Sequence, residues 1–131
     1  MEMEKKEGKR LKILLVDDEE SFLELAEIKL KRLGYKVITA TTGENCLKLA
    51  EKESPDLVLL DVMMPGMDGG ETAHLLLENP KTKNIPIIFL TSIISKREEQ
   101  ECLGEPGGHL FVAKPFDTKR LLGAIEKALK S

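Results

Sequence analysis

The sequence lacks the features that mark membrane, secreted and metal-thiolate proteins. It has no apolar run approaching the roughly 20 residues that span a bilayer, and its charged N-terminus has no apolar stretch before Leu11. Its two cysteines, Cys46 and Cys102, have no CxxC spacing, so we expect free thiols in a reducing compartment. These absences predict a cytoplasmic protein without a membrane partner.

A concentrated basic face is also absent. The net charge is -3, and lysine and arginine are spread along the 131 residues. We therefore expect no direct nucleic acid binding by this domain, because such binding requires clustered basic residues. With 41% hydrophobic residues, the chain fits one globular domain, residues 10–131, preceded by a disordered charged leader, residues 1–9.

Short apolar runs alternate with helical patterns along the chain. The almost continuously apolar runs, typical of strands buried on both faces of a parallel sheet, are 13–16, 37–40, 57–60, 87–90 and 110–113. The helical patterns cover residues 21–33, 43–51, 70–78, 96–103 and 118–130. Five such units predict a flavodoxin-like, doubly wound five-stranded parallel sheet of order 2-1-3-4-5 with five helices. In the last helix, the residues expected to face inward are Leu121, Leu122, Ile125 and Leu129.

Acidic residues and one lysine stand where the predicted strands end. Asp17 and Asp18 follow the first strand, Asp61 follows the third, and Lys114 follows the fifth. In this strand order the switch point lies between strands 1 and 3, and ligands bind beyond the carboxyl ends of the strands there. Carboxylates beside one ammonium suit a divalent cation and a phosphoryl group. We expect Glu19 only to favour the start of the next helix.

Four sequence blocks surround these strand ends: LLVDDEE at 14–20, LLDVMMPGMDG at 59–69, FLTS at 89–92 and VAKPF at 112–116. Through them, residues 11–130 resemble a receiver domain of the two-component response regulators. The resemblance implies that Asp61 is a phosphoacceptor. It would take its phosphoryl group from a histidine kinase or a histidine phosphotransfer protein, and the domain would then act on an unknown output partner. We expect a signalling module that catalyses only its own phosphorylation and dephosphorylation, not an enzyme.

The same resemblance implies a Mg²⁺ site. Asp18 would ligate the ion directly and Asp17 mainly through water, and Asp61 and the backbone carbonyl of Met63 would be further ligands. Mg²⁺ suits such a site because it keeps several waters, accepts a few carboxylate oxygens and bridges to phosphate. A second interpretation, that Asp17 and Asp18 cap the following helix, is compatible with the first.

The resemblance also assigns residues to phosphoryl binding and switching. Lys114 would pair with one phosphoryl oxygen, and Thr91 would hydrogen-bond another, although a threonine that ends a strand is common for turn reasons. Phe111 stands where such domains carry a switch aromatic, and an ordinary core phenylalanine is an equal alternative. The Lys114–Pro115 peptide bond would be cis, which would aim the ammonium over the strand ends.

Two apolar residues, Met63 and Ile93, would flank the phosphoryl group by the same resemblance. Neither side chain can position a hydrolytic water by hydrogen bonding, so we expect a long-lived phospho-Asp61. The alternative is that both side chains merely pack on their loops. Gly70 departs from the family, which usually has a large apolar residue there, and it should loosen the start of the helix at 70–78.

Three other functions compete with the phosphoacceptor. A haloacid-dehalogenase-like phosphotransferase needs a second aspartate two residues beyond the nucleophile, where this chain has Met63. A flavodoxin-like FMN binder needs a Ser/Thr/Gly phosphate loop after the first strand, where this chain has the DDEE sequence. A pseudo-receiver that serves purely as an interaction module requires a site that has lost metal binding. The matching residues favour the phosphoacceptor over all three.

Overall fold

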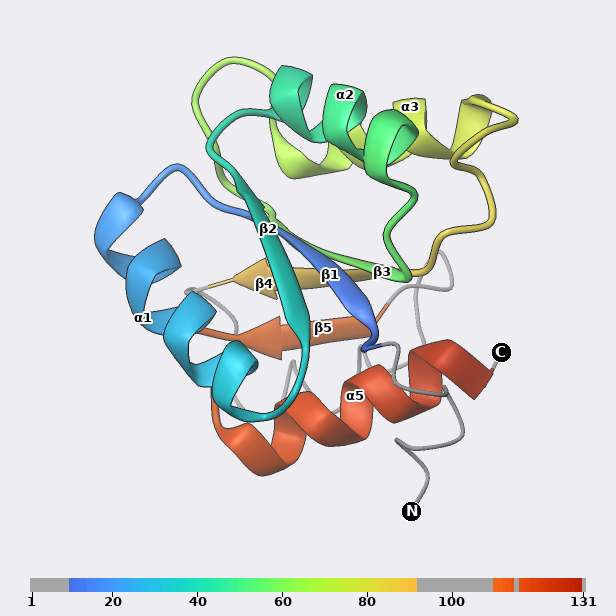
Figure 1. Cartoon of the computed structure of the whole chain (residues 1–131). Coiled ribbons are helices and arrows are strands. Elements are labelled where there is room, and N and C mark those ends of the chain that lie inside the picture. Colours follow the sequence, from blue (N-terminus) through green and yellow to red (C-terminus); the bar gives the residue numbers. More distant parts are fainter. Residues whose placement is uncertain (1–9, 92–109, 115, 131) are drawn as a thin grey trace.

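A five-stranded parallel sheet, in the order β2-β1-β3-β4-β5, forms the centre of the molecule (Figure 1). The computed structural model describes residues 10–91, 110–114 and 116–130. The strands are β1 Lys12–Val16, β2 Lys36–Ala40, β3 Leu57–Asp61, β4 Ile87–Thr91 and β5 Leu110–Ala113. The predicted strand order and parallel direction are confirmed.

Alternate residues of each inner strand enter two separate hydrophobic layers. In β1, Ile13 and Leu15 belong to one buried cluster, and Leu14 and Val16 belong to the other. Because both faces of the sheet are covered, successive side chains are all apolar, which explains the unbroken runs in the sequence.

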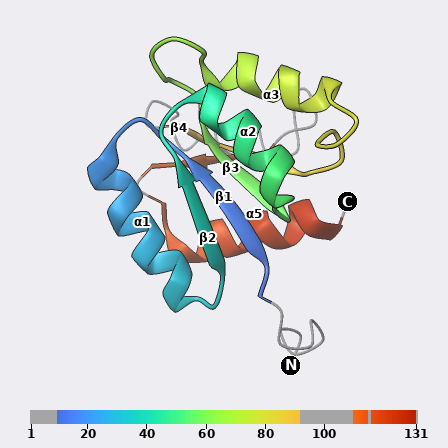
Figure 2. The same ribbon diagram turned by 45° about the horizontal axis from the view of Figure 1, so that its top comes forward.

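Helices cover both faces of the sheet. α1 Glu20–Arg32 and α5 Thr118–Lys130 pack on one face, while α2 Gly43–Glu53 and α3 Gly69–Glu78 pack on the other (Figure 2). The predicted helix at 96–103 lies outside the described residues, as does Cys102. Cys46 is a buried free thiol in α2.

One expectation about the core is wrong. Leu121 and Ile125 are buried, but Leu129 is 37% exposed. Leu129 lies in the last turn of α5, where Ala128 packs against the core instead. The stripe of α5 that faces the sheet therefore follows Leu121, Ala124, Ile125 and Ala128, which is the ordinary spacing of three and four residues.

Side chains at the helix starts agree with the local sequence. The side chain of Thr42 accepts a hydrogen bond from the backbone N–H of Asn45, and Asp68 accepts one from Glu71. These are N-caps, which satisfy N–H groups that have no partner inside the helix.

In the part of the chain that the structure describes, no helix is long and apolar enough to cross a membrane.

Candidate functional site

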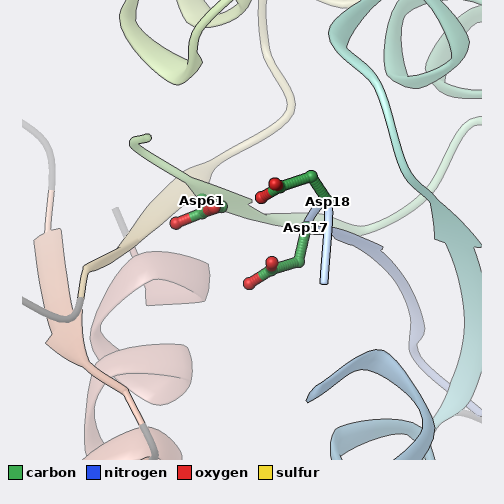
Figure 3. Close-up of side chains that lie close together, drawn as sticks. All are labelled: Asp17, Asp18 and Asp61. Atoms are coloured by element: carbon green, nitrogen blue, oxygen red, sulfur yellow. The ribbon is translucent and has the colours of Figure 1, made fainter. Parts of the chain in front are cut away.

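Three carboxylates lie together at the ends of β1 and β3 (Figure 3). These strands are neighbours in register, with Val16 opposite Leu60, so Asp17, which follows β1, and Asp61, the last residue of β3, lie at one sheet edge. Each of Asp17, Asp18 and Asp61 has a carboxylate oxygen within 4.8 Å of the others. The topology therefore produces the cluster that the strand-end pattern predicts.

The three carboxylates differ in their contact with solvent. Asp17 is 0% exposed and Asp61 is 3% exposed, whereas Asp18 is exposed. The Oδ1 atom of Asp17 accepts a 2.9 Å hydrogen bond from the backbone N–H of Glu19. Asp17 is therefore held in place by the first turn after β1, and Asp18 is the member that solvent reaches most easily.

Lys114 brings a single ammonium into this cluster from the end of β5. Its Nζ atom donates a 2.7 Å hydrogen bond to Oδ2 of Asp17 and lies 3.6 Å from Oδ1 of Asp61. The side chain is only 9% exposed. The backbone N–H of Lys114 donates to the carbonyl of Thr91, which anchors the lysine to the end of β4.

Burial and charge shift the titration of two members of the site. Burial, with the negative charge of Asp17 second, raises the pKa of Asp61 to about 6, although Lys114 and the backbone N–H of Met63 oppose the shift. Burial alone would lower the pKa of Lys114. The hydrogen bond and charge of Asp17, aided by Asp61, outweigh burial and raise the pKa of Lys114.

The loop after Asp61 returns close to the strand end. The backbone N–H of Val62 donates to the carbonyl of Leu90, and the N–H of Gly69 donates to the carbonyl of Val62. A Cβ atom at Gly69 would collide with the carbonyl oxygen of Asp61. Gly69 thus permits a close approach of backbone to backbone beneath the site. α3 begins at Gly69 with Asp68 as its cap, and the loosening effect of Gly70 on this start stays a prediction.

The other site residues that the resemblance implies differ in burial, and some lie outside the described part of the chain. Thr91 is buried at the end of β4, and the side chain of Met63 is 60% exposed. Phe111 is partly buried and stacks on Phe89 at a centroid distance of 5.2 Å, so it packs against the core. Pro115 and Ile93 lie outside the described residues.

Sequence reasoning missed two contacts of the site lysine. Glu19 has no side-chain capping bond, and its carboxylate lies 3.5 Å from Nζ of Lys114, so the expectation that it serves only the helix start is wrong. The ring of Phe22 lies under the same ammonium, 4.8 Å from its centroid. Phe22 lies in the first turn of α1, and no spacing in the sequence marks it as a neighbour of Lys114.

The carboxylate set fits a divalent cation. Carboxylate oxygens are the ligands that Mg²⁺ and Ca²⁺ prefer, and three of them converge here from two neighbouring strands. Asp17 and Asp61 are buried, and among the described residues Lys114 is the one cation beside them, so this part of the cluster carries excess negative charge. A bound cation would remove part of the repulsion between these groups.

Comparisons with known proteins agree with this geometry. A family model, that of the response regulator receiver domain, matches residues 13–126. The chain is 42% identical over 120 residues to the alkaline phosphatase synthesis transcriptional regulatory protein PhoP of Bacillus subtilis, which covers 91% of this chain and 48% of PhoP. It is 39% identical over 114 residues to the response regulator PleD of Caulobacter vibrioides, covering 87% of this chain and 25% of PleD. The chain thus spans about half of PhoP and a quarter of PleD.

Solved structures show the same fold over nearly the whole chain. The chemotaxis protein CheY4 of Vibrio cholerae superposes with a TM-score of 0.78 at 33% identity, covering 92% of this chain and 100% of that one. The N-terminal domain of a response regulator receiver protein from Methanoculleus marisnigri gives a TM-score of 0.69 at 37% identity, covering 92% and 97%.

Proposed function

Because this chain belongs to the response regulator receiver domain family, we propose that Asp61 accepts a phosphoryl group in a Mg²⁺-dependent reaction. The donor is a histidine kinase or a histidine phosphotransfer protein. One observation carries the proposal: Asp61 is buried beside two other carboxylates and 3.6 Å from the ammonium of Lys114. A lone aspartate capping a turn would need neither neighbour.

The reaction is a transfer between two covalent partners. A carboxylate oxygen of Asp61 forms a bond to phosphorus, while the bond from phosphorus to the donor imidazole nitrogen breaks, and the imidazole leaves with its electron pair. Such a transfer needs positioning and charge neutralisation more than covalent help. When bound by Asp17, Asp18, Asp61 and the Met63 backbone carbonyl, Mg²⁺ would supply much of that neutralisation.

Lys114 would contribute positive charge from the protein itself to this neutralisation. Its ammonium already lies between Asp17 and Asp61 and has three donors, so it can hydrogen-bond a phosphoryl oxygen on Asp61. Thr91, buried at the end of the neighbouring strand, would donate its hydroxyl to another oxygen. When Asp61 is phosphorylated, the packing of Phe111 on Phe89 would change.

The output of the switch belongs to the whole protein. The chain spans 48% of PhoP and 25% of PleD, so the match concerns only the receiver part of those relatives. We propose that this domain acts as a signalling module that presents a changed surface to a partner, with no catalysis on a separate substrate.

Acetyl phosphate tests the assignment without a kinase. With Mg²⁺, intact mass spectrometry should show one added phosphoryl group on the wild type and none on Asp61→Asn. Asp68→Asn is the matched control, because it makes the same change on the loop that follows, where asparagine can still cap α3. Undiminished labelling of Asp61→Asn would overturn the assignment. A wild type that folds but is never labelled would instead support the pseudo-receiver alternative.

A second measurement tests the metal site separately. Millimolar Mg²⁺ should raise the melting temperature of the wild type, because a ligand that binds only the folded state stabilises it by mass action. Asp18→Asn should reduce this rise, since the variant loses one ligand of the cluster. A melting temperature that does not respond to Mg²⁺ would contradict the proposed cation site.

A further inference from the structure

Among the residues that the structure describes, four groups lie around the ammonium of Lys114. Three are carboxylates, those of Asp17 at 2.7 Å, Glu19 at 3.5 Å and Asp61 at 3.6 Å. The fourth is the ring of Phe22, whose centroid is 4.8 Å from Nζ. This distance is within the range in which the negative face of an aromatic ring attracts a cation.

The Phe22 ring is itself held by a second aromatic side chain. Phe116 meets it edge to face, with centroids 6.0 Å apart and an interplanar angle of 85°. The Nζ atom of Lys29 lies 5.2 Å from the centroid of the Phe116 ring. Two rings thus stand between two cations, and only one of those cations belongs to the site.

The ring adds an attraction to the ammonium beside those of the three carboxylates. Lysine has a flexible four-carbon stem, so its head adopts a defined position only where its surroundings restrict it. Asp17, Glu19 and Asp61 all attract the ammonium, and the shortest contact is to Asp17. An apolar residue without a π face would fill the volume of Phe22 but would not attract the ammonium.

We propose that Phe22 is a positioning residue of the site, holding the Lys114 ammonium within reach of Asp61. The proposal rests on the proposed function of Asp61. Phe22 acts through Lys114 and does not contact the phosphoryl group. The edge-to-face contact with Phe116 keeps the ring in the orientation that the ammonium needs.

A purely structural role of Phe22 would give a different pattern among its variants. Phe22 is partly buried and packs against the core cluster, so a filler role would be served equally well by leucine. If the π face matters, tyrosine should replace phenylalanine and leucine should not. A cation–π contact of ordinary strength corresponds to about a three- to tenfold effect on a rate that depends on it.

The test uses three variants of the full chain and acetyl phosphate with Mg²⁺. Phe22→Leu should lower the rate of Asp61 labelling about three- to tenfold, and Phe22→Tyr should restore most of it. Leu25→Ala is the control, because Leu25 lies on the same helix, is 70% exposed and should leave the rate unchanged. Because acetyl phosphate is a small molecule, differences in rate between the variants do not arise from altered docking of a protein donor.

Nuclear magnetic resonance supplies a readout that does not depend on phosphorylation. The ε-methylene protons of Lys114 should be shifted upfield by the Phe22 ring in the wild type, and Phe22→Leu should abolish this shift. Loss of the shift together with slower labelling supports the proposal. Equal rates for the leucine and tyrosine variants, or no upfield shift in the wild type, overturns it. If the shift is present but wild-type Asp61 is never labelled, the function proposed for Asp61 has failed, and with it the proposed role of Phe22.

Discussion

Lys114 donates a 2.7 Å hydrogen bond to Asp17, a residue 97 positions earlier in the chain. Its ammonium is 3.6 Å from Asp61, so the contact with Asp17 is the shorter of the two. The same side chain joins the ends of three strands, β1, β3 and β5. A single positive charge is therefore shared among carboxylates that the sheet topology brings together.

We expect Lys114→Gln to slow Asp61 labelling by acetyl phosphate by about 100-fold, because glutamine can donate a hydrogen bond but cannot neutralise charge. The initial rate of labelling at saturating Mg²⁺ measures the effect. Lys119→Gln is the control, since Lys119 is an exposed lysine of α5. A Lys114→Gln rate within twofold of wild type would remove Lys114 from the transfer step.

Titration of Asp61 should be visible in the pH dependence of stability without metal. Burial and the charge of Asp17 raise its pKa to about 6, above the ordinary value of 3.8. The folded state therefore binds this proton more tightly than the unfolded state does. The stabilising contribution is complete below about pH 4 and is lost as the pH rises through about 6.

Asp61→Asn isolates this effect because asparagine does not titrate. In excess EDTA, the free energy of unfolding of the variant should exceed that of the wild type by a margin that grows between about pH 4 and pH 7. The margin should level off at up to about 3 kcal/mol, at about 1.4 kcal/mol for each unit of pKa shift. Urea unfolding at a series of pH values gives the two curves, and a margin that does not vary with pH would contradict the raised pKa.

The parallel sheet explains why most of the site could be predicted from sequence. Neighbouring parallel strands end on one edge, so Asp17, Asp18 and Asp61 had to meet once the order of β1 and β3 was inferred. The contacts of Glu19 and Phe22 with Lys114 depend on where the start of α1 lies relative to the end of β5 and on side-chain rotamers. No spacing in the sequence determines these.

Some helix ends and helix faces also could not be predicted from the sequence. The helix predicted to end at residue 51 continues to Glu53, and Ser54, with a positive φ of 49°, ends it directly before Pro55. Leu129 has the right spacing for the inner face of α5, yet it remains exposed because the core ends before it. Periodicity predicts a direction along a helix, whereas burial also depends on how far the opposing sheet extends.

Two adjacent glycines offer a sharp test of the backbone beneath Asp61. A Cβ at Gly69 would collide with the Asp61 carbonyl oxygen and approach Cα of Val62 to 2.8 Å, whereas a Cβ at Gly70 would meet only a side-chain oxygen of Asp68 at 3.6 Å. We expect Gly69→Ala to destabilise the fold by about 1–3 kcal/mol. Gly70→Ala should be neutral or stabilise by up to about 1 kcal/mol, because alanine favours a helix.

Thermal unfolding and labelling by acetyl phosphate distinguish these outcomes. Gly69→Ala should lower the melting temperature and slow the labelling of Asp61, since the backbone of the strand end must shift. Gly70→Ala should label at the wild-type rate. Equal stability of the two variants would show that the backbone at Gly69 relaxes without disturbing Asp61.

The lifetime of phospho-Asp61 should depend on Met63. Met63 is two residues beyond Asp61 and 60% exposed, so substitution there should not disturb the core. Hydrolysis requires a water positioned in line with phosphorus, and an apolar methionine cannot orient one. We expect Met63→Asn to speed the loss of phosphate up to about tenfold, a small share of what a fully positioned general base can give. The loss is followed by intact mass spectrometry after the donor is removed. Met63→Leu keeps an apolar side chain of similar bulk and should decay like the wild type, and an asparagine variant that decays no faster than the leucine variant would show that Met63 does not control hydrolysis.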